Sequence, residues 1–238
     1  MQTQADTPHS PTVNRELRTL LIDADDTLWE NNIYFERVAE EYVATLGRMG
    51  QRTERVEQLL WETEQRNVKI TGYGSQAFCE SLREVCRQLG VAELESWIGE
   101  KVMWIRRHPI ELMPGVRETL PRLQAVNRLI LLTKGREDEQ LAKLERSGLA
   151  SFFHAREVVF EKSVETYREL VAKHGLAPER TWMIGNSPRS DINPARAAGL
   201  RTVFIPYHTT WQHELEEITP DGGTLMLENF GQLAEHFL

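Results

Sequence analysis

The chain has 238 residues, of which 40% are hydrophobic and 27% charged, with a formal net charge of −8. This length suits one α/β domain with an insertion or two small domains, and the composition is typical of a soluble globular protein. The negative charge argues against a broad nucleic-acid or anionic-membrane surface, and no apolar stretch approaches the length of a membrane span.

The first 15 residues are polar and contain no apolar core of the kind that a signal peptide needs. We therefore expect them to form a flexible tail. Cys79 and Cys86 are too few for a disulfide framework and do not have CxxC spacing. The simplest expectation is two reduced cysteines in a cytoplasmic protein.

The first predicted strand is the short apolar run at 20–22, which ends at Asp23, with a second carboxylate two residues later at Asp25. Such runs are typical of buried parallel strands, and ligands collect outside the carboxyl ends of parallel strands. Clustered carboxylates repel one another and are costly to desolvate, so a cation or a reaction usually explains them. We expect an active site at the end of this strand.

The section from about residue 34 to 108 has few strand signals and shows helical periodicity instead. Four helices are predicted, at 35–46, 55–70, 75–90 and 94–107. Inserted between the first two strands, they would form a separate small bundle. Trp61 lies at a helical spacing and is expected to pack in the core of this bundle.

From residue 114 onward, helices and strands alternate. Helices are predicted at 114–124, 137–148, 163–175, 190–199 and 227–238, and strands at 127–135, 156–162, 180–186 and 201–206. The strand at 201–206 is expected to be the last. This alternation implies βαβ units and a parallel sheet with right-handed crossovers.

The sequence DADDT at 23–27 resembles the DxDxT signature of the haloacid dehalogenase (HAD) superfamily, a group dominated by phosphatases. Three further signatures follow in the family's order: Thr133 at the end of the second strand, Lys162 before a helix, and GNSPRSD at 185–191, which is similar to GDSxxxD. The resemblance implies an α/β fold, with a Rossmann-like parallel sheet, helices on both faces and an inserted α-helical cap domain. The core domain would comprise 16–32 and 112–238, and the cap domain 33–111.

The resemblance also implies catalytic roles. Asp23 would be the nucleophile, since a carboxylate can attack phosphorus to form an acyl phosphate. Asp25 would protonate the leaving oxygen and later deprotonate the attacking water. The hydroxyl of Thr133 and the neighbouring amides can donate to phosphate oxygens. Lys162 would neutralise the phosphate and the nucleophile, and Lys134 is its nearest rival and a second candidate for phosphate binding.

A dianionic phosphate would be repelled by these carboxylates without a cation, and Mg²⁺ prefers hard oxygen ligands. By similarity to the family, Asp23, the backbone carbonyl of Asp25 and Asp191 would hold Mg²⁺. The first carboxylate of the fourth motif is replaced by Asn186, which can still offer a neutral oxygen. One less negative charge should weaken the metal site without abolishing it.

The main prediction is therefore a Mg²⁺-dependent phosphatase that acts on a small phosphorylated metabolite, with no nucleic-acid or membrane partner. A phosphomutase would keep both aspartates, and a 2-haloacid dehalogenase would need neither the metal nor Asp25. A non-catalytic module that binds a phospho-ligand or a protein is the third alternative, because a fold alone does not establish a function. The sequence leaves open the leaving group, the oligomeric state and whether the loop around Tyr73 contacts substrate.

Overall fold

The computed structural model describes residues 17–92, 94–218 and 223–238; the expected tail at 1–15 lies outside them. The strands form one parallel sheet in the order β3-β2-β1-β4-β5-β6. Their bounds are β1 Arg18–Ile22, β2 Asn127–Lys134, β3 Ala155–Val159, β4 Thr181–Gly185, β5 Arg201–Phe204 and β6 Thr224–Met226. This confirms the parallel α/β sheet, with the first strand at its centre.

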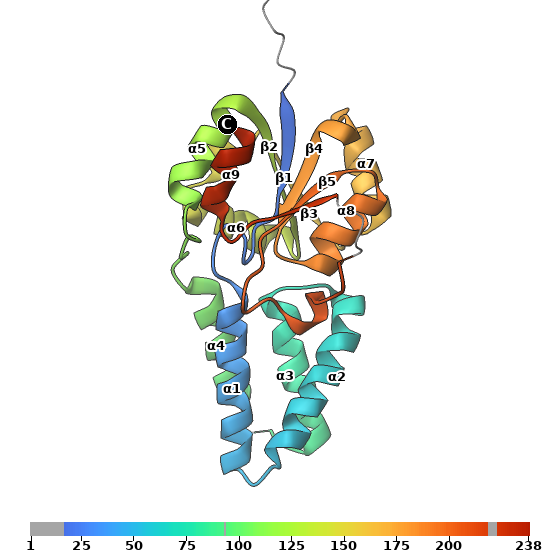
Figure 1. Cartoon of the computed structure of the whole chain (residues 1–238). Coiled ribbons are helices and arrows are strands. Elements are labelled where there is room, and N and C mark those ends of the chain that lie inside the picture. The colour runs from blue at the N-terminus through green and yellow to red at the C-terminus, as the bar shows by residue number, and fades with distance from the viewer. Residues whose placement is uncertain (1–16, 93, 219–222) are drawn as a thin grey trace, which may run out of the picture.

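Helices cover both faces of the sheet (Figure 1). One face carries α5 (Val116–Val126), α6 (Glu137–Ser147) and α9 (Leu233–Phe237), and the other carries α7 (Val164–His174) and α8 (Asn193–Ala197). Alternate residues of β1 serve the two faces: Leu20 and Ile22 pack in the first layer, and Leu21 in the second. Because β1 is apolar on both faces, it is buried between the two layers.

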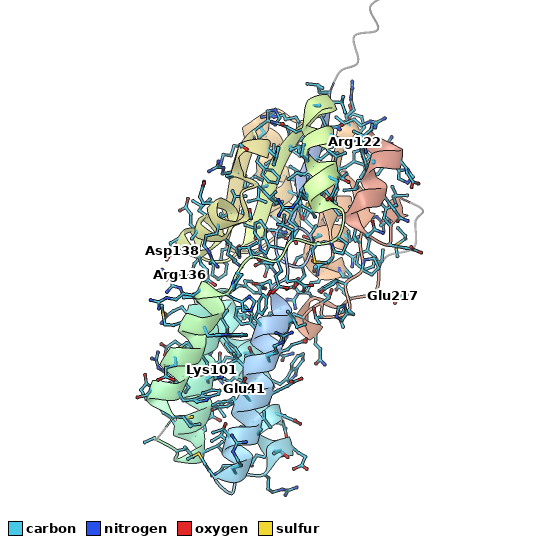
Figure 2. All side chains as sticks on the ribbon, turned by 90° about the vertical axis from the view of Figure 1, so that its left-hand side faces the viewer. Glu41, Lys101, Arg122, Arg136, Asp138 and Glu217 are labelled. Atoms are coloured by element: carbon cyan, nitrogen blue, oxygen red, sulfur yellow. The ribbon has the colours of Figure 1, made fainter. Side chains whose placement is uncertain are left out.

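Four further helices form a bundle beyond the carboxyl ends of the strands (Figure 1). They are α1 (Asn32–Arg48), α2 (Thr53–Thr71), α3 (Ser75–Leu89) and α4 (Glu95–Arg107), close to the bounds that the periodicity predicts. They enclose a hydrophobic cluster of their own, with Tyr42, Leu46 and Leu82 fully buried. An ion pair between Glu41 and Lys101 joins α1 to α4 (Figure 2).

The structure differs from the sequence-based expectation in the last part of the chain. The strand at 201–206 is not the last, because β6 pairs with β5 at the edge of the sheet. Because β6 has only three residues, an alternation of apolar and polar side chains cannot be recognised in its sequence. The helix expected over 227–238 is confined to α9, because Asn229 is fully extended (φ −158°, ψ 166°) and a 3₁₀ turn follows it. The helix expected at 190–199 begins instead as a wide turn, Pro188–Ile192, before α8.

Within the described ranges, no helix combines the length and the apolar character required to cross a membrane.

Candidate active site

A cavity of about 160 Å³ is lined by residues at the carboxyl ends of the strands and by residues of the helical bundle. All seven site residues expected from the sequence line it: Asp23, Asp25, Thr133, Lys134, Lys162, Asn186 and Asp191. Residues that are far apart in the sequence thus line the same cavity. Parallel strands produce this result because their carboxyl ends share one edge of the sheet.

Lys162 lies between two carboxylates at the base of the cavity. Its Nζ donates to Oδ1 of Asp23 at 2.5 Å and to Oδ1 of Asp191 at 2.7 Å, and all three side chains are almost completely buried. The other oxygen of Asp191 accepts from the backbone N–H of Ser187 at 3.0 Å. Gly185 is required at the end of β4, because a Cβ there would lie 2.1 Å from Oδ2 of Asp191.

With both carboxylates ionised, this trio carries one positive charge against two negative ones. Burial raises the pKa of Asp23 to about 7; Lys162 opposes this rise and Asp191 adds to it. Burial alone would lower the pKa of Lys162, but Asp191 and Asp23 raise it above its ordinary value, so the ammonium stays charged. The surplus negative charge on the carboxylate pair favours a second cation beside Asp23.

Thr27 and Asn186 lie on the other side of Asp23. Oγ1 of Thr27 is 2.9 Å from Oδ2 of Asp23 and 3.3 Å from Oδ1 of Asn186, so it can donate to either oxygen. The amide nitrogen of Asn186 donates to Oγ1 of Thr210 at 3.0 Å. These contacts fix the orientation of Asn186, with its carbonyl oxygen toward the Thr27 hydroxyl.

Asp25 is surrounded by donors that the sequence did not indicate. Its carboxylate accepts from Trp29 Nε1 at 2.8 Å, from Gln140 Nε2 at 2.9 Å and from Lys143 Nζ at 2.7 and 2.8 Å. Burial raises the pKa of Asp25, but Lys143 and these hydrogen bonds outweigh it and hold the pKa below its usual value. Gln140 and Lys143 are three residues apart on one face of α6, and this spacing was the only signal in the sequence that could have linked them.

Lys134 has carboxylate partners. Its Nζ donates to Glu214 at 2.6 Å, to Ser190 at 2.8 Å and to Glu161 at 3.4 Å, and it lies 3.9 Å from the centre of the Tyr73 ring. Lys162, and not its rival Lys134, is the lysine that contacts Asp23.

Glu214, from the segment that follows β5, is a buried carboxylate that the sequence analysis missed, because no motif surrounds it. It also accepts from Oγ of Ser187 at 2.6 Å and from Oγ of Ser190 at 2.5 Å. Burial raises its pKa, but Lys134 and the two serines lower it to about 2. The carboxylate of Glu214 therefore accepts hydrogen bonds from three side chains, those of Ser187, Ser190 and Lys134.

The bundle contacts the rest of the chain at several points around the cavity. Trp61 of α2 stacks on His213, with ring centres 3.8 Å apart and planes at 12°. The expectation that Trp61 packs in the bundle core is therefore wrong, because it faces the segment after β5. Ser75, at the start of α3, donates through its backbone N–H and its hydroxyl to Glu139 of α6.

The oxygen atoms around Asp23 set what kind of metal the site could hold. Among the described residues, no group of three or more His, Cys, Asp or Glu side chains is placed to hold a metal ion. A cation here would depend on Asp23 and Asp191, with the neutral oxygens of Asn186 and the Asp25 backbone. Mg²⁺ is commonly bound by one or two carboxylates together with water and substrate oxygens, so this donor set fits it.

A family model for haloacid dehalogenase-like hydrolases matches residues 17–199. The chain belongs to this hydrolase family. A solved structure of a haloacid dehalogenase-like family hydrolase from Xanthomonas campestris is 28% identical, with a TM-score of 0.80 over 92% of this chain and 94% of that one.

Two curated relatives of this HAD-like hydrolase have named activities. A glyceraldehyde 3-phosphate phosphatase from Methanopyrus kandleri is 27% identical over 202 residues, which are 79% of this chain and 84% of the relative. A phosphoserine phosphatase from Thermus thermophilus is 35% identical over 82 residues, and this match spans only 33% of that enzyme. Both names describe hydrolases that act on phosphate esters.

Proposed function

We propose that this HAD-like hydrolase is a Mg²⁺-dependent phosphatase that hydrolyses a small phosphate monoester through an aspartyl-phosphate intermediate. The observation that carries the proposal is the position of Lys162, with its ammonium 2.5 Å from Asp23 and 2.7 Å from Asp191. A nucleophilic carboxylate beside a fixed positive charge is what attack on a dianionic phosphoryl group requires. The phosphatase names of the relatives support the same reaction class.

In the first step, a carboxylate oxygen of Asp23 attacks phosphorus and the bond to the leaving oxygen breaks. Thr133, buried at the end of β2, offers its hydroxyl to a phosphate oxygen, while Lys162 balances the charge. Asp25 gives a proton to the leaving oxygen. In the second step, Asp25 takes a proton from water, which attacks the same phosphorus and releases phosphate and free Asp23.

Asp23, Asp191, the backbone carbonyl of Asp25 and Asn186 would hold the Mg²⁺ ion. When bound, the ion would offset the charge of the phosphate and the two carboxylates. With Asn186 in place of a carboxylate, the chain's own residues contribute one less negative charge to this balance.

In this proposal the helices within residues 33–111 act as a cap that closes over the substrate. The stacking of Trp61 on His213 and the Ser75–Glu139 hydrogen bonds support this role, because they join the bundle to the rim of the cavity. Tyr73 lines the cavity from the loop between α2 and α3, where it can meet the substrate. A cavity of about 160 Å³ suits a small phosphorylated metabolite.

We also propose a cytoplasmic location. Cys79 and Cys86 are both buried and unpaired, as expected for a protein that keeps its thiols reduced.

The test is phosphate release from an aryl phosphate and from a panel of small sugar, glycerol and amino-alcohol phosphates, with and without Mg²⁺. Metal-dependent release by the wild type and none by Asp23→Asn is the expected result. A phosphomutase would instead move the phosphoryl group to an acceptor alcohol with little free phosphate.

The pairing of Asp25 with Lys143 gives one reason to include a haloacid dehalogenase assay. A carboxylate with a lowered pKa is a poor proton donor, and dehalogenation by an aspartate needs no such donor. Metal-independent release of halide from 2-chloropropionate, without phosphatase activity, would replace the proposed reaction with this alternative.

A further inference from the structure

Glu64 of α2 lines the cavity from the side of the bundle, opposite the strand ends that carry Asp23. Its side chain is half-buried, and within the described parts of the chain it has neither a hydrogen bond nor an ion pair. Burial raises the pKa of Glu64 to about 7, with no charged neighbour opposing the rise. It is therefore a carboxyl group that faces the cavity without a partner.

The charges that line the cavity are unequal. The acidic side chains are Asp23, Asp25, Asp26, Glu64, Glu139, Asp191 and Glu214, and the lysines are Lys134, Lys143 and Lys162, which gives seven carboxyl groups against three amino groups. Each of these lysines already contacts a carboxylate. Among the described lining residues, none is a cation left over for a second acidic group on the substrate, besides the phosphate that Lys162 would meet.

The bundle also contributes apolar residues to the lining of the cavity. Phe35, Val68, Ala77 and Phe78 line the same cavity, and the rings of Phe35 and Phe78 meet edge to face with their centres 5.3 Å apart. Apolar and aromatic walls suit a short carbon chain, and aromatic faces attract cations. The bundle side thus combines an apolar lining with one unpaired carboxyl group.

We propose that Glu64 selects a substrate whose alcohol part carries a positively charged amino group, so that the physiological ester is an aminoalkyl phosphate. This inference rests on the proposed phosphatase function and adds the substrate class. The ammonium pairs with Glu64 while the phosphate at the other end of the molecule meets Asp23 and Lys162. A leaving group with a carboxylate would instead be repelled by the acidic lining.

The size of the effect follows from the chemistry of the pair. An ammonium that reaches Glu64 forms a charge-assisted hydrogen bond with a partly buried carboxylate. A neutral alkyl group leaves the carboxyl unpaired in an apolar setting. The preference should therefore appear mainly in KM, because Glu64 contacts the leaving group and not the reacting phosphorus.

The experiment compares kcat/KM for three esters of similar size: 2-aminoethyl phosphate, ethyl phosphate and carboxymethyl phosphate. The wild type is compared with Glu64→Gln, which keeps the shape and removes the charge, and with Glu62→Gln as a matched control. Glu62 is exposed on the same helix, and among the described residues its side chain accepts a hydrogen bond only from Gln58. Thermal unfolding of each variant verifies that it is folded.

We expect the wild type to prefer 2-aminoethyl phosphate over ethyl phosphate by on the order of tenfold, and carboxymethyl phosphate to be the poorest substrate. Glu64→Gln should lose most of this preference through a higher KM for the amine, while Glu62→Gln retains it. Equal kcat/KM for the amine and the ethyl ester, or an unchanged preference in Glu64→Gln, would overturn the inference. If no ester, including an aryl phosphate, is hydrolysed, the proposed function fails and the inference fails with it.

Discussion

The Nζ atom of Lys143 lies 2.7 Å from Oδ1 and 2.8 Å from Oδ2 of Asp25. This lysine on α6 thereby stabilises the ionised form of Asp25, the residue that we assign as the proton donor. The pair is mostly buried, so the interaction is only weakly screened by solvent.

Removing this charge should change the pH dependence of the reaction. Lys143 lowers the pKa of Asp25, so Lys143→Met should raise that pKa. The limb of the pH–rate profile that reports protonated Asp25 should then move to higher pH for an alkyl phosphate. Lys143→Arg keeps the charge and is the control. If the profile of Lys143→Met superimposes on that of the wild type, Asp25 does not act as the acid.

Substitution of Asp25 itself should depend on the leaving group. Asp25→Asn should reduce turnover of an alkyl phosphate by on the order of 10² to 10⁴. The loss in the first step should be smaller for an aryl phosphate, because a good leaving group needs less protonation. The measurement is rapid-quench kinetics with both substrates, and an equal loss for the two would make Asp25 a structural carboxylate.

The replacement of a carboxylate by Asn186 should be visible in metal affinity. Asn186→Asp adds a negative charge near Asp23 and Asp191, so the Mg²⁺ concentration for half-maximal activity should fall several-fold. Part of the gain would be lost if the crowded carboxylates raise one another's pKa. Asp191→Asn should raise the half-maximal concentration steeply. A titration curve unmoved by Asp191→Asn would mean that Asp191 is not a ligand.

Glu214 should contribute to stability in a pH-dependent way. Its pKa is lowered from 4.5 to about 2, so its contribution is present above pH 4.5 and is lost as the pH falls toward 2. At neutral pH this lowering of the pKa corresponds to a stabilisation of about 3 kcal/mol at most. Urea unfolding at pH 7, 5, 4 and 3 gives the difference in free energy of unfolding between the wild type and Glu214→Gln. We expect this difference to narrow only below pH 5. A difference in free energy of unfolding that is constant over this pH range would contradict the lowered pKa of Glu214.

The sequence was informative where a strand ends. Asp23 and Thr133 lie at the ends of apolar runs, and the alternation of strands and helices predicts that the ends of those runs meet at one edge of the sheet. Asp191 lies in the loop after a third such run, where the resemblance to the family's fourth motif indicated it. For the same reason the sheet class and the main helices could be predicted, while the three-residue β6 could not.

The partners of the site were hidden because they approach it through tertiary packing. Lys143 and Glu64 are polar residues on helices, where they look like solvated surface positions, and Glu214 lies in a segment without a motif. Only the folded chain shows that Lys143 contacts Asp25 and that Glu64 faces the cavity. The contact of Trp61 with His213 was missed because helical periodicity does not show which neighbour an apolar residue meets.

The central claim is that Asp23 forms a covalent acyl phosphate, and acid quench during turnover tests it most directly. Borohydride reduces an aspartyl phosphate to homoserine, which mass spectrometry of the peptide that contains residue 23 can detect. We expect homoserine at position 23 in the wild type only when substrate and Mg²⁺ are present, and neither homoserine nor turnover in folded Asp23→Asn. Steady-state hydrolysis by Asp23→Asn, or reduction at another carboxylate in its place, would contradict the account.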